Sequence, residues 1–196
     1  MRKTAQREDI RDLILDAVDG LLATYGYGKM TMEDVARQVG IGKGTIYLHF
    51  PSKQELVLAH IDRIAETVVG KLEEIAASPD PIDRRLRRML VIRVLHRFDS
   101  VAHYSRSLGE LLSSVRSPLM ARRQAYFEKE AAVLEGVLRE GARLGTLDCA
   151  DPRTASFVLI QSTNSHLPFN LSARELGRRE ELEDQVGRIA ELLVKG

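Results

Sequence analysis

Hydrophobic residues recur along most of this chain at spacings of three and four positions, which is the period of an amphipathic α-helix. In the segment from about 7 to 25 the stripe consists of Ile10, Leu13, Ile14, Ala17, Val18, Leu21 and Leu22. A short basic arm precedes this predicted helix, and Gly26 ends it. The alternation with a period of two that marks a strand is not apparent in any segment. The pattern therefore predicts an all-α protein.

Residues 31–56 have the pattern of two short helices followed at once by the start of a third. Thr31 and Asp34 form a predicted capping box at the first helix, and Gly40 is the residue expected just past its end. A second glycine two positions later precedes the second helix, which Pro51 closes. Two helices joined by a short turn that contains glycine are typical of a helix-turn-helix that enters the DNA major groove.

The remaining chain is predicted to form six more helices, which brings the total to about nine. Their approximate ranges are 52–77, 82–98, 101–115, 117–145, 151–167 and 180–194. Ser117-Pro118 and Asp151-Pro152 are each interpreted as an N-cap followed by proline at the first helical position. The helix over 151–167 is unusual because it contains a polar run, 161–166. The last helix carries apolar residues at spacings of four, three and four, namely Leu182, Val186, Ile189 and Leu193. This seam for another helix is assigned to a dimer interface, although it fits packing within the chain equally well.

Composition narrows the class of protein. The 196 residues carry a net charge of only +1, with the bases of the first quarter at the N-terminal arm and around the second short helix. The single cysteine, Cys149, excludes an internal disulfide and a cysteine zinc cage. We predict no metal site and no cofactor. Because no apolar run approaches the roughly 20 residues needed to cross a bilayer and no secretory signal is visible, we expect a cytoplasmic protein without membrane contact.

The helix-turn-helix segment also keeps a longer set of residues at fixed spacings: Gly26-Tyr27, Thr31, Asp34-Val35-Ala36, Val39-Gly40-Ile41, Lys43-Gly44-Thr45-Ile46-Tyr47, His49-Phe50 and Ser52-Lys53-Gln54-Glu55-Leu56. In these residues the chain resembles the N-terminal domain of the TetR family of transcriptional regulators. The resemblance implies a three-helix DNA-binding domain over 1–52. It also implies a helical domain over 53–196 for effector binding and dimerisation.

The resemblance implies that the protein is a homodimeric regulator that binds a palindromic operator in double-stranded DNA. We expect a repressor that a small, largely apolar effector releases from DNA. One alternative is a DNA-binding regulator or architectural protein without a small-molecule effector. The least favoured alternative is a small helical enzyme, because the sequence contains no nucleophile, phosphate-loop or metalloprotease pattern.

Seven residues are assigned to DNA: Thr31, Lys43, Gly44, Thr45, Tyr47, His49 and Lys53. Lys43 lies in the first turn of the second short helix, where a lysine can donate to guanine O6 and N7. Thr45 can contact a thymine methyl group, and Gly44 lets the helix approach the groove closely. The alternative for Lys43 and Thr45 is that both are ordinary solvated polar residues.

Tyr47, His49 and Lys53 match positions that hold the DNA backbone in the family. Tyr47 is also interpreted as half core, and His49 as equally suited to capping or packing. Thr31 could offer its hydroxyl and the amides of a helix N-terminus to a phosphate, beside its capping role. Leu48 departs from the family pattern, which often has an aromatic residue there, so one backbone contact would be missing.

The larger domain is expected to hold the effector among few polar and many apolar groups. The candidates are Arg93, Phe98, His103, Tyr104, Leu108, Tyr126, Phe127, Gln161 and Asn164, although aromatic residues at helical spacing are also typical of plain core. Arg93 shares a helical sector with apolar residues and therefore faces inward. A buried cation needs a partner, which could be Glu110 or an anionic ligand; alternatively Arg93 reaches solvent. The other arginines of this helix are interpreted as a solvated face.

Overall fold

This computed structural model describes residues 2–168 and 177–195, with the side chains of 2–9 and 194–195 left aside. Every regular element in these ranges is helical: eight α-helices and two short 3-10 helices. The chain divides into two compact units. Unit 1 contains residues up to Arg63 together with His103–Leu119, and unit 2 contains Ile64–Ala102 together with residues from Met120 onward. The all-α prediction is confirmed.

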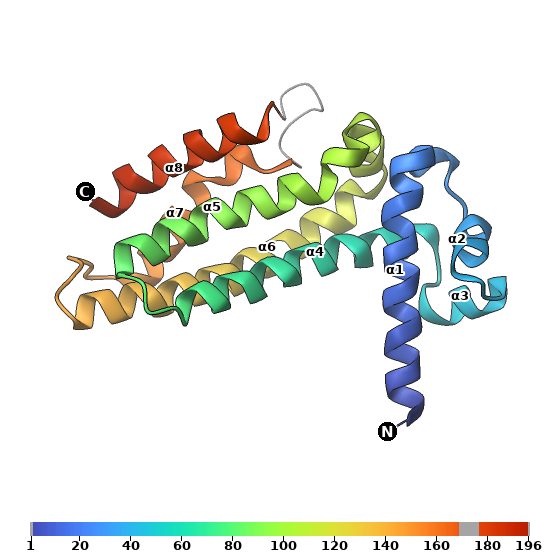
Figure 1. Cartoon of the computed structure of the whole chain (residues 1–196), viewed down its shortest axis with the longest axis horizontal. Helices are drawn as coiled ribbons and strands as arrows, with labels where there is room; N and C mark the ends of the chain where they lie inside the picture. The colour runs from blue at the N-terminus through green and yellow to red at the C-terminus, as the bar shows by residue number, and fades with distance from the viewer. Residues whose placement is uncertain (1, 169–176, 196) are drawn as a thin grey trace. The chain divides into compact units, whose positions relative to one another are not determined.

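Unit 1 is built on α1 (Arg2–Lys29), α2 (Met32–Val39), α3 (Lys43–His49) and the first part of α4 (Lys53–Ala76), and α1 packs against α2 (Figure 1). The predicted stop at the end of α1 is present, because Gly26 has a non-helical φ of 71°. The start differs, since α1 begins at Arg2 rather than after a basic arm. Most of the apolar stripe of α1 is buried together with the inward residues of α2 and α3, including Ile14, Val18, Leu22, Val35 and Ile46, whereas Leu13 is exposed.

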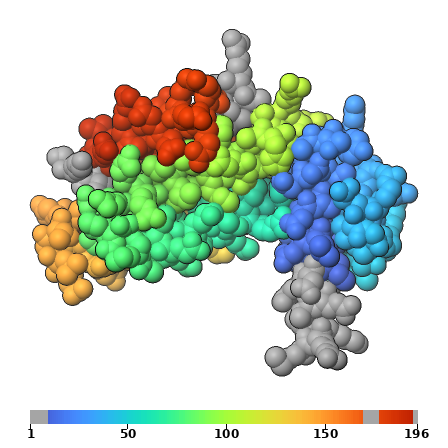
Figure 2. Space-filling view, viewed as in Figure 1, coloured from blue at the N-terminus to red at the C-terminus, as the bar shows by residue number. Residues whose placement is uncertain are grey.

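Unit 2 contains α5 (Ile82–Val101), α7 (Pro152–Ser162) and α8 (Arg179–Lys195). It also contains α6 (Ser105–Arg143) from Met120 onward. The 3-10 helix η1 (Ala102–Tyr104) follows α5, and η2 (Asn164–His166) follows α7. Helix α8 lies along α5, as Figures 1 and 2 show. The core of unit 2 is formed by apolar side chains from α4 to α8, among them Val68, Leu72, Leu86, Leu90, Leu134, Leu138, Leu159, Ile160 and Ala190.

The prediction of two helices over 101–115 and 117–145 is wrong, because α6 runs without interruption past Pro118. Proline removes one backbone hydrogen bond and strains the preceding turn. Buried apolar residues on both sides, Val115 and Leu119, keep the helix in place against that cost. This merger accounts for the difference between eight α-helices in the described ranges and the nine expected.

Two further boundaries differ from expectation. Helix α5 continues through Asp99 and Ser100 to Val101, and the polar run 161–166 lies at the end of α7 and in η2 rather than inside one helix. The division into units also does not follow the expected boundary at 52/53, because the first turns of α4 and the start of α6 belong to unit 1. A possible extra turn near 172–175 lies outside the described residues. None of the described helices is both long and apolar enough to cross a membrane.

Candidate DNA interface and buried arginine cluster

The start of α2 is fixed by the predicted capping box. The amide of Asp34 donates to the Thr31 hydroxyl at 3.1 Å, and the amide of Thr31 donates to Asp34 Oδ2 at 3.0 Å. The Thr31 hydroxyl in turn donates to the same carboxylate at 2.6 Å. These hydrogen bonds hold the pKa of Asp34 below its ordinary value. The Thr31 hydroxyl proton is therefore occupied within the protein, while the first amides of α2 still point out of the helix end.

The turn between α2 and α3 is built by a left-handed glycine. Gly40 has φ 76° and its amide donates to the carbonyls of Ala36 and Arg37, which closes α2. Ile41 N donates to Ala36 O at 3.0 Å, which completes the turn. Helix α3 then begins at Lys43 after an extended Gly42.

Helix α3 buries one side and presents the other outward. Ile46 is buried, whereas Tyr47 and Leu48 are 46% and 73% exposed. Lys43 and Gly44 are exposed as well, and a Cβ added at Gly44 would meet no atom within 4 Å. Thr45 and His49 are half-buried, and the His49 ring lies 6.4 Å from that of Phe50. The outward face thus combines a cation, a bare backbone segment, a phenol and an apolar side chain.

The charge on this face is partly balanced by an acid of α2. Lys43 Nζ lies 3.6 Å from Glu33 Oε2, and both side chains are more than half exposed. An exposed pair of this kind is weak because water screens both charges. Lys43 can therefore exchange Glu33 for another acceptor at little cost.

Lys53 lies in a different environment from the one expected for a phosphate contact. Its ammonium donates to the carbonyls of Tyr27, Gly28 and Met30 at 2.8, 3.4 and 3.0 Å. It also lies 4.4 Å from the centroid of the Tyr27 ring. An ammonium has three N–H donors, so Lys53 ties the start of α4 to the last turn of α1 and the link that follows it. The assignment of Lys53 to the DNA backbone remains a prediction, and the structure gives it a role inside unit 1.

The nine residues expected around the effector do not form one group. His103, Tyr104 and Leu108 belong to unit 1, whereas the other six belong to unit 2. In unit 1, His103 Nε2 lies 3.0 Å from one oxygen of Asp19, and His60 Nε2 lies 3.5 Å from the other. His60 Nε2 is also 3.4 Å from Tyr104 Oη. Burial lowers the pKa of His60 to about 4, so its ring is neutral at pH 7. The sequence did not single out His60, which occupies an ordinary apolar position of α4.

Arg93, which the sequence predicts to face inward, lies at the centre of a buried hydrogen-bond network in unit 2. Its side chain is fully buried, its Nε donates to Glu130 at 2.5 Å, and its terminal nitrogens donate to Thr163 and Asn164 at 2.7 and 2.6 Å. Arg97 donates to the other oxygen of Glu130 at 2.5 Å and to the Arg93 carbonyl at 2.9 Å. The polar run that follows α7 therefore supplies acceptors to a guanidinium about 70 residues away along the chain. We call Arg93, Arg97, Glu130, Thr163 and Asn164 the arginine cluster.

The arginine cluster corrects three sequence interpretations. Arg93 faces inward as expected, but its carboxylate partner is Glu130 and not Glu110, which lies beside Gly28 in unit 1. Arg93 does not reach solvent. Two of the arginines interpreted as a solvated face, Arg85 and Arg97, are also buried, and Arg85 donates to both carboxylate oxygens of Glu140 at 2.9 and 2.7 Å.

Phe127 joins the arginine cluster to the surface of unit 2. The guanidinium carbon of Arg93 lies 5.2 Å from the centroid of the Phe127 ring, and that of Arg123 lies 5.0 Å from it. Phe127 and Arg123 are both half-buried. Burial lowers the pKa of Arg93 to about 10, and the nearby charges of Arg97 and Arg123 act in the same direction. Of the other candidates, Phe98 is buried, Tyr126 is half-buried and Gln161 is exposed.

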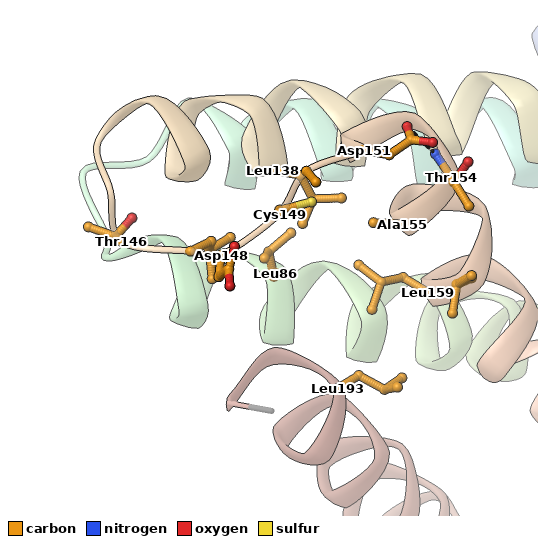
Figure 3. A pocket seen from close by; sticks show the side chains of 13 residues that line it. Leu86, Leu138, Thr146, Asp148, Cys149, Asp151, Thr154, Ala155, Leu159 and Leu193 are labelled. Atoms are coloured by element: carbon orange, nitrogen blue, oxygen red, sulfur yellow. Dashed lines mark hydrogen bonds between the residues drawn. The ribbon is translucent and has the colours of Figure 1, made fainter.

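A cavity of about 650 Å³ lies elsewhere in unit 2, and none of the expected effector residues lines it. Figure 3 shows apolar side chains from α5, α6, α7 and α8 around it, with polar groups of the loop that precedes α7. Its lining includes Leu86, Leu138, Leu147, Cys149, Val158, Leu159 and Leu193, with Thr146, Asp148, Asp151 and Thr154 as polar members. Sequence reasoning missed this site because its walls have the same apolar pattern as core. Among the described residues, no group of three histidine, cysteine or acidic side chains could hold a metal ion.

The predicted seam of α8 faces mainly its own chain. Leu182 and Val186 are buried within unit 2, where α8 packs on α5, so neither is open to a second copy. Ile189 is half-buried, and Leu193 is 41% exposed. This corrects the assignment of Leu182 and Val186 to a dimer interface. The exposed apolar residues of the last two helices are instead Val158, Leu192 and Leu193.

The sequence and the structure were each compared with known proteins, and both comparisons find similar DNA-binding regulators. Residues 14–60 match the family described as "Bacterial regulatory proteins, tetR family". The chain is 30% identical over 170 residues to the nucleoid occlusion factor SlmA of Alteromonas mediterranea, covering 85% of this chain and 84% of that protein. Among solved structures, a transcriptional regulator from Cytophaga hutchinsonii aligns with a TM-score of 0.77 at 22% identity, over 94% of this chain and 96% of that one. The regulator FadR from Bacillus subtilis, solved in complex with stearoyl-CoA, aligns with a TM-score of 0.63 at 21% identity, over 94% and 97%.

Proposed function

This chain belongs to the TetR family of transcriptional regulators, and from that premise we propose that it acts as a homodimer on a palindromic DNA operator. The observation that carries the proposal is the outward face of α3, which a capped α2 and a left-handed glycine turn hold away from the core. Two copies of α3 read two half-sites about one helical turn, roughly 34–36 Å, apart. We expect the protein to work in the cytoplasm as a regulator and not as an enzyme.

On DNA, Lys43 donates to guanine O6 and N7 and gives up its weak contact with Glu33. Gly44 allows the backbone of α3 to approach the bases, and Thr45 contacts a thymine methyl group. Tyr47 and His49 donate to phosphates, as does the N-terminus of α2 next to Thr31, which fixes the register without reading sequence.

Dimerisation is supported by the apolar residues that the last two helices leave exposed. Val158 of α7 and Leu192 and Leu193 of α8 are each at least 41% exposed. Burial of these side chains against a second copy would remove their apolar surface from water.

We place the effector in unit 2 and expect it to be small and largely apolar. The FadR structure with stearoyl-CoA supports an effector with a large apolar part. Effector binding favours a dimer whose half-site spacing does not fit DNA, so the regulator acts as a repressor that the effector releases. The free energy by which the effector weakens DNA binding is set, at most, by the difference in its affinity for the two states.

The test is selection of bound sequences from random duplexes at moderate salt, repeated with cell extract as a source of effector. We expect a palindromic motif, and weaker binding to it when extract is present. Binding without sequence preference would contradict the proposal.

A second candidate is a DNA-binding protein without a small-molecule effector. It is favoured by the identity with SlmA, which is described as a nucleoid occlusion factor. In that case the selected duplex would still be bound, and neither extract nor any small molecule would weaken the complex.

A further inference from the structure

The arginine cluster holds more positive than negative charge. Arg93 and Arg97 are both buried and share the single carboxylate of Glu130, one oxygen each. Among the described residues, Glu130 is the acid that pairs with either guanidinium. These three side chains therefore carry a net charge of +1 in the interior of unit 2.

A net buried charge is costly, because the protein interior replaces strong hydration with weaker interactions. Hydroxyl and amide oxygens of Thr163 and Asn164 reduce this cost as hydrogen-bond acceptors but bring no negative charge. A purely structural ion pair needs one arginine and one glutamate, so the second arginine adds a positive charge that Glu130 does not balance. A ligand with a negative charge would supply the missing balance.

The surroundings show where such a charge can approach. Phe127 lies against Arg93 and is half-buried, and Arg123, on the same ring, is half-buried as well. The guanidinium carbons of Arg93 and Arg123 are within about 10 Å of each other, since each lies about 5 Å from one ring. An anion that enters beside Arg123 would meet a partly solvated guanidinium, an aromatic ring and then the buried pair.

An apolar-lined cavity lies further along the same helices, and the buried core residues Met89, Leu90 and Leu134 separate it from the arginine cluster. Arg93 lies seven residues along α5 from Leu86, and Glu130 lies eight residues along α6 from Leu138. Leu86 and Leu138 both line the 650 Å³ cavity, so the cavity and the arginine cluster are about 10–12 Å apart along both helices. The polar residues of the cavity include Asp148 and Asp151, so the cavity is not the place for the anionic group.

We propose that unit 2 takes an amphiphilic organic anion, whose carboxylate or phosphate binds beside Arg123 and Phe127 at the edge of the arginine cluster. This inference rests on the proposed function, because it names the chemical class of the effector. The apolar part of the anion packs against the half-buried ring of Phe127. A neutral or cationic molecule of the same shape binds more weakly because it leaves the positive charge unbalanced.

The experiment compares decanoate, decanol and decylamine, which share an apolar chain and differ in charge. Binding to the full-length protein is measured by calorimetry below the micelle-forming concentration. We expect decanoate to bind at least about tenfold more tightly than the other two, a difference of about 1.4 kcal/mol. A parallel set of 2-naphthoate, 2-naphthylmethanol and 2-naphthylmethylamine repeats the comparison with a rigid body.

Three variants locate the charge that is responsible. Arg123→Gln should weaken decanoate about tenfold and change decanol less than twofold, whereas Arg123→Lys should retain most of the preference for the anion. Arg116→Gln, at an exposed arginine of the same helix, is the matched control and should change nothing. Circular dichroism and unfolding temperature confirm that each variant is folded.

Equal binding of the three decyl compounds, absence of binding by both anions, or an anion preference that survives Arg123→Gln would each overturn the inference. Failure of the proposed function gives a different result. If the anions bind as expected but leave the affinity for the selected duplex unchanged, the charge site stands and the effector response does not.

Discussion

Two cationic regions of this protein differ in what surrounds the charge. Lys43 on α3 is more than half exposed and lies near one exposed carboxylate. Arg93 and Arg97 in unit 2 are buried; Arg93 donates to Glu130, Thr163 and Asn164, and Arg97 donates to Glu130 and the Arg93 carbonyl. A solvated cation can change its partner freely, so the α3 surface is suited to transient contact with DNA. A buried cation is held by its partners, so the arginine cluster organises three segments of the fold around itself.

The largest expected effect tests the buried region. Glu130→Gln removes the carboxylate that Arg93 and Arg97 share, and should lower the free energy of unfolding by about 3–5 kcal/mol, the usual cost of breaking a buried ion pair. Urea denaturation at pH 7 measures the change. Glu183→Gln, which removes an exposed partner of Arg179, is the control and should have little effect. Equal, small effects would mean that burial does not separate the two kinds of cation.

The second prediction concerns a buried group that must stay neutral. Burial lowers the pKa of His60 from 6.5 to about 4, so the unfolded chain binds a proton that the folded chain does not between these values. Stability should therefore fall as the pH drops from about 6.5 toward 4, by on the order of 2–3 kcal/mol. In His60→Gln this part of the pH dependence should be missing when urea denaturation at pH 5 and pH 7 is compared. An unchanged difference between the two pH values would show that His60 is not responsible.

The third prediction separates two lysines ten residues apart. Lys53→Met removes the donors to three carbonyls and should lower the free energy of unfolding by about 1–3 kcal/mol. If Lys53 acts only inside unit 1, affinity for the operator falls but the slope of log affinity against log salt stays the same. A slope that falls by about one would instead restore the phosphate contact that the resemblance implies.

The smallest expected effect sharpens the description of the exposed region. If Lys43 contacts DNA as proposed, Glu33→Gln removes a carboxylate that competes for it, and should raise operator affinity by at most about fivefold, or about 1 kcal/mol. Fluorescence anisotropy with a labelled duplex measures it. Asp83→Asn, an acid on α5, should leave DNA binding unchanged. A loss of affinity in Glu33→Gln would mean that Glu33 positions Lys43 for DNA and does not compete with it.

The difference between local and long-range contacts explains what could be predicted from the sequence. The capping box of Thr31 and Asp34 and the glycine at position 40 act through neighbours three or four residues away, so their signals are local and were interpreted correctly. The inward direction of Arg93 followed from helical periodicity. Its partner did not, because Glu130 is 37 residues away and nothing in the pattern distinguishes it from Glu110.

Two other errors come from patterns with more than one solution. A seam on α8 fits either a second copy or α5, and the choice depends on packing that the seam itself does not encode. Ser117-Pro118 has the composition of a helix start, but the burial of Val115 and Leu119 carries α6 through it. The cavity was missed because leucines that line a void and leucines that fill one have the same spacing.

The central claim is that the exposed face of α3 reads DNA sequence through Lys43. The most direct measurement compares native protein and Lys43→Ala in binding to the selected operator and to duplexes changed at single base pairs. We expect Lys43→Ala to lose about 1–3 kcal/mol of discrimination at one guanine position and to keep its discrimination elsewhere. If Lys43→Ala retains the full selectivity of the native protein at every position, the account of this surface is wrong.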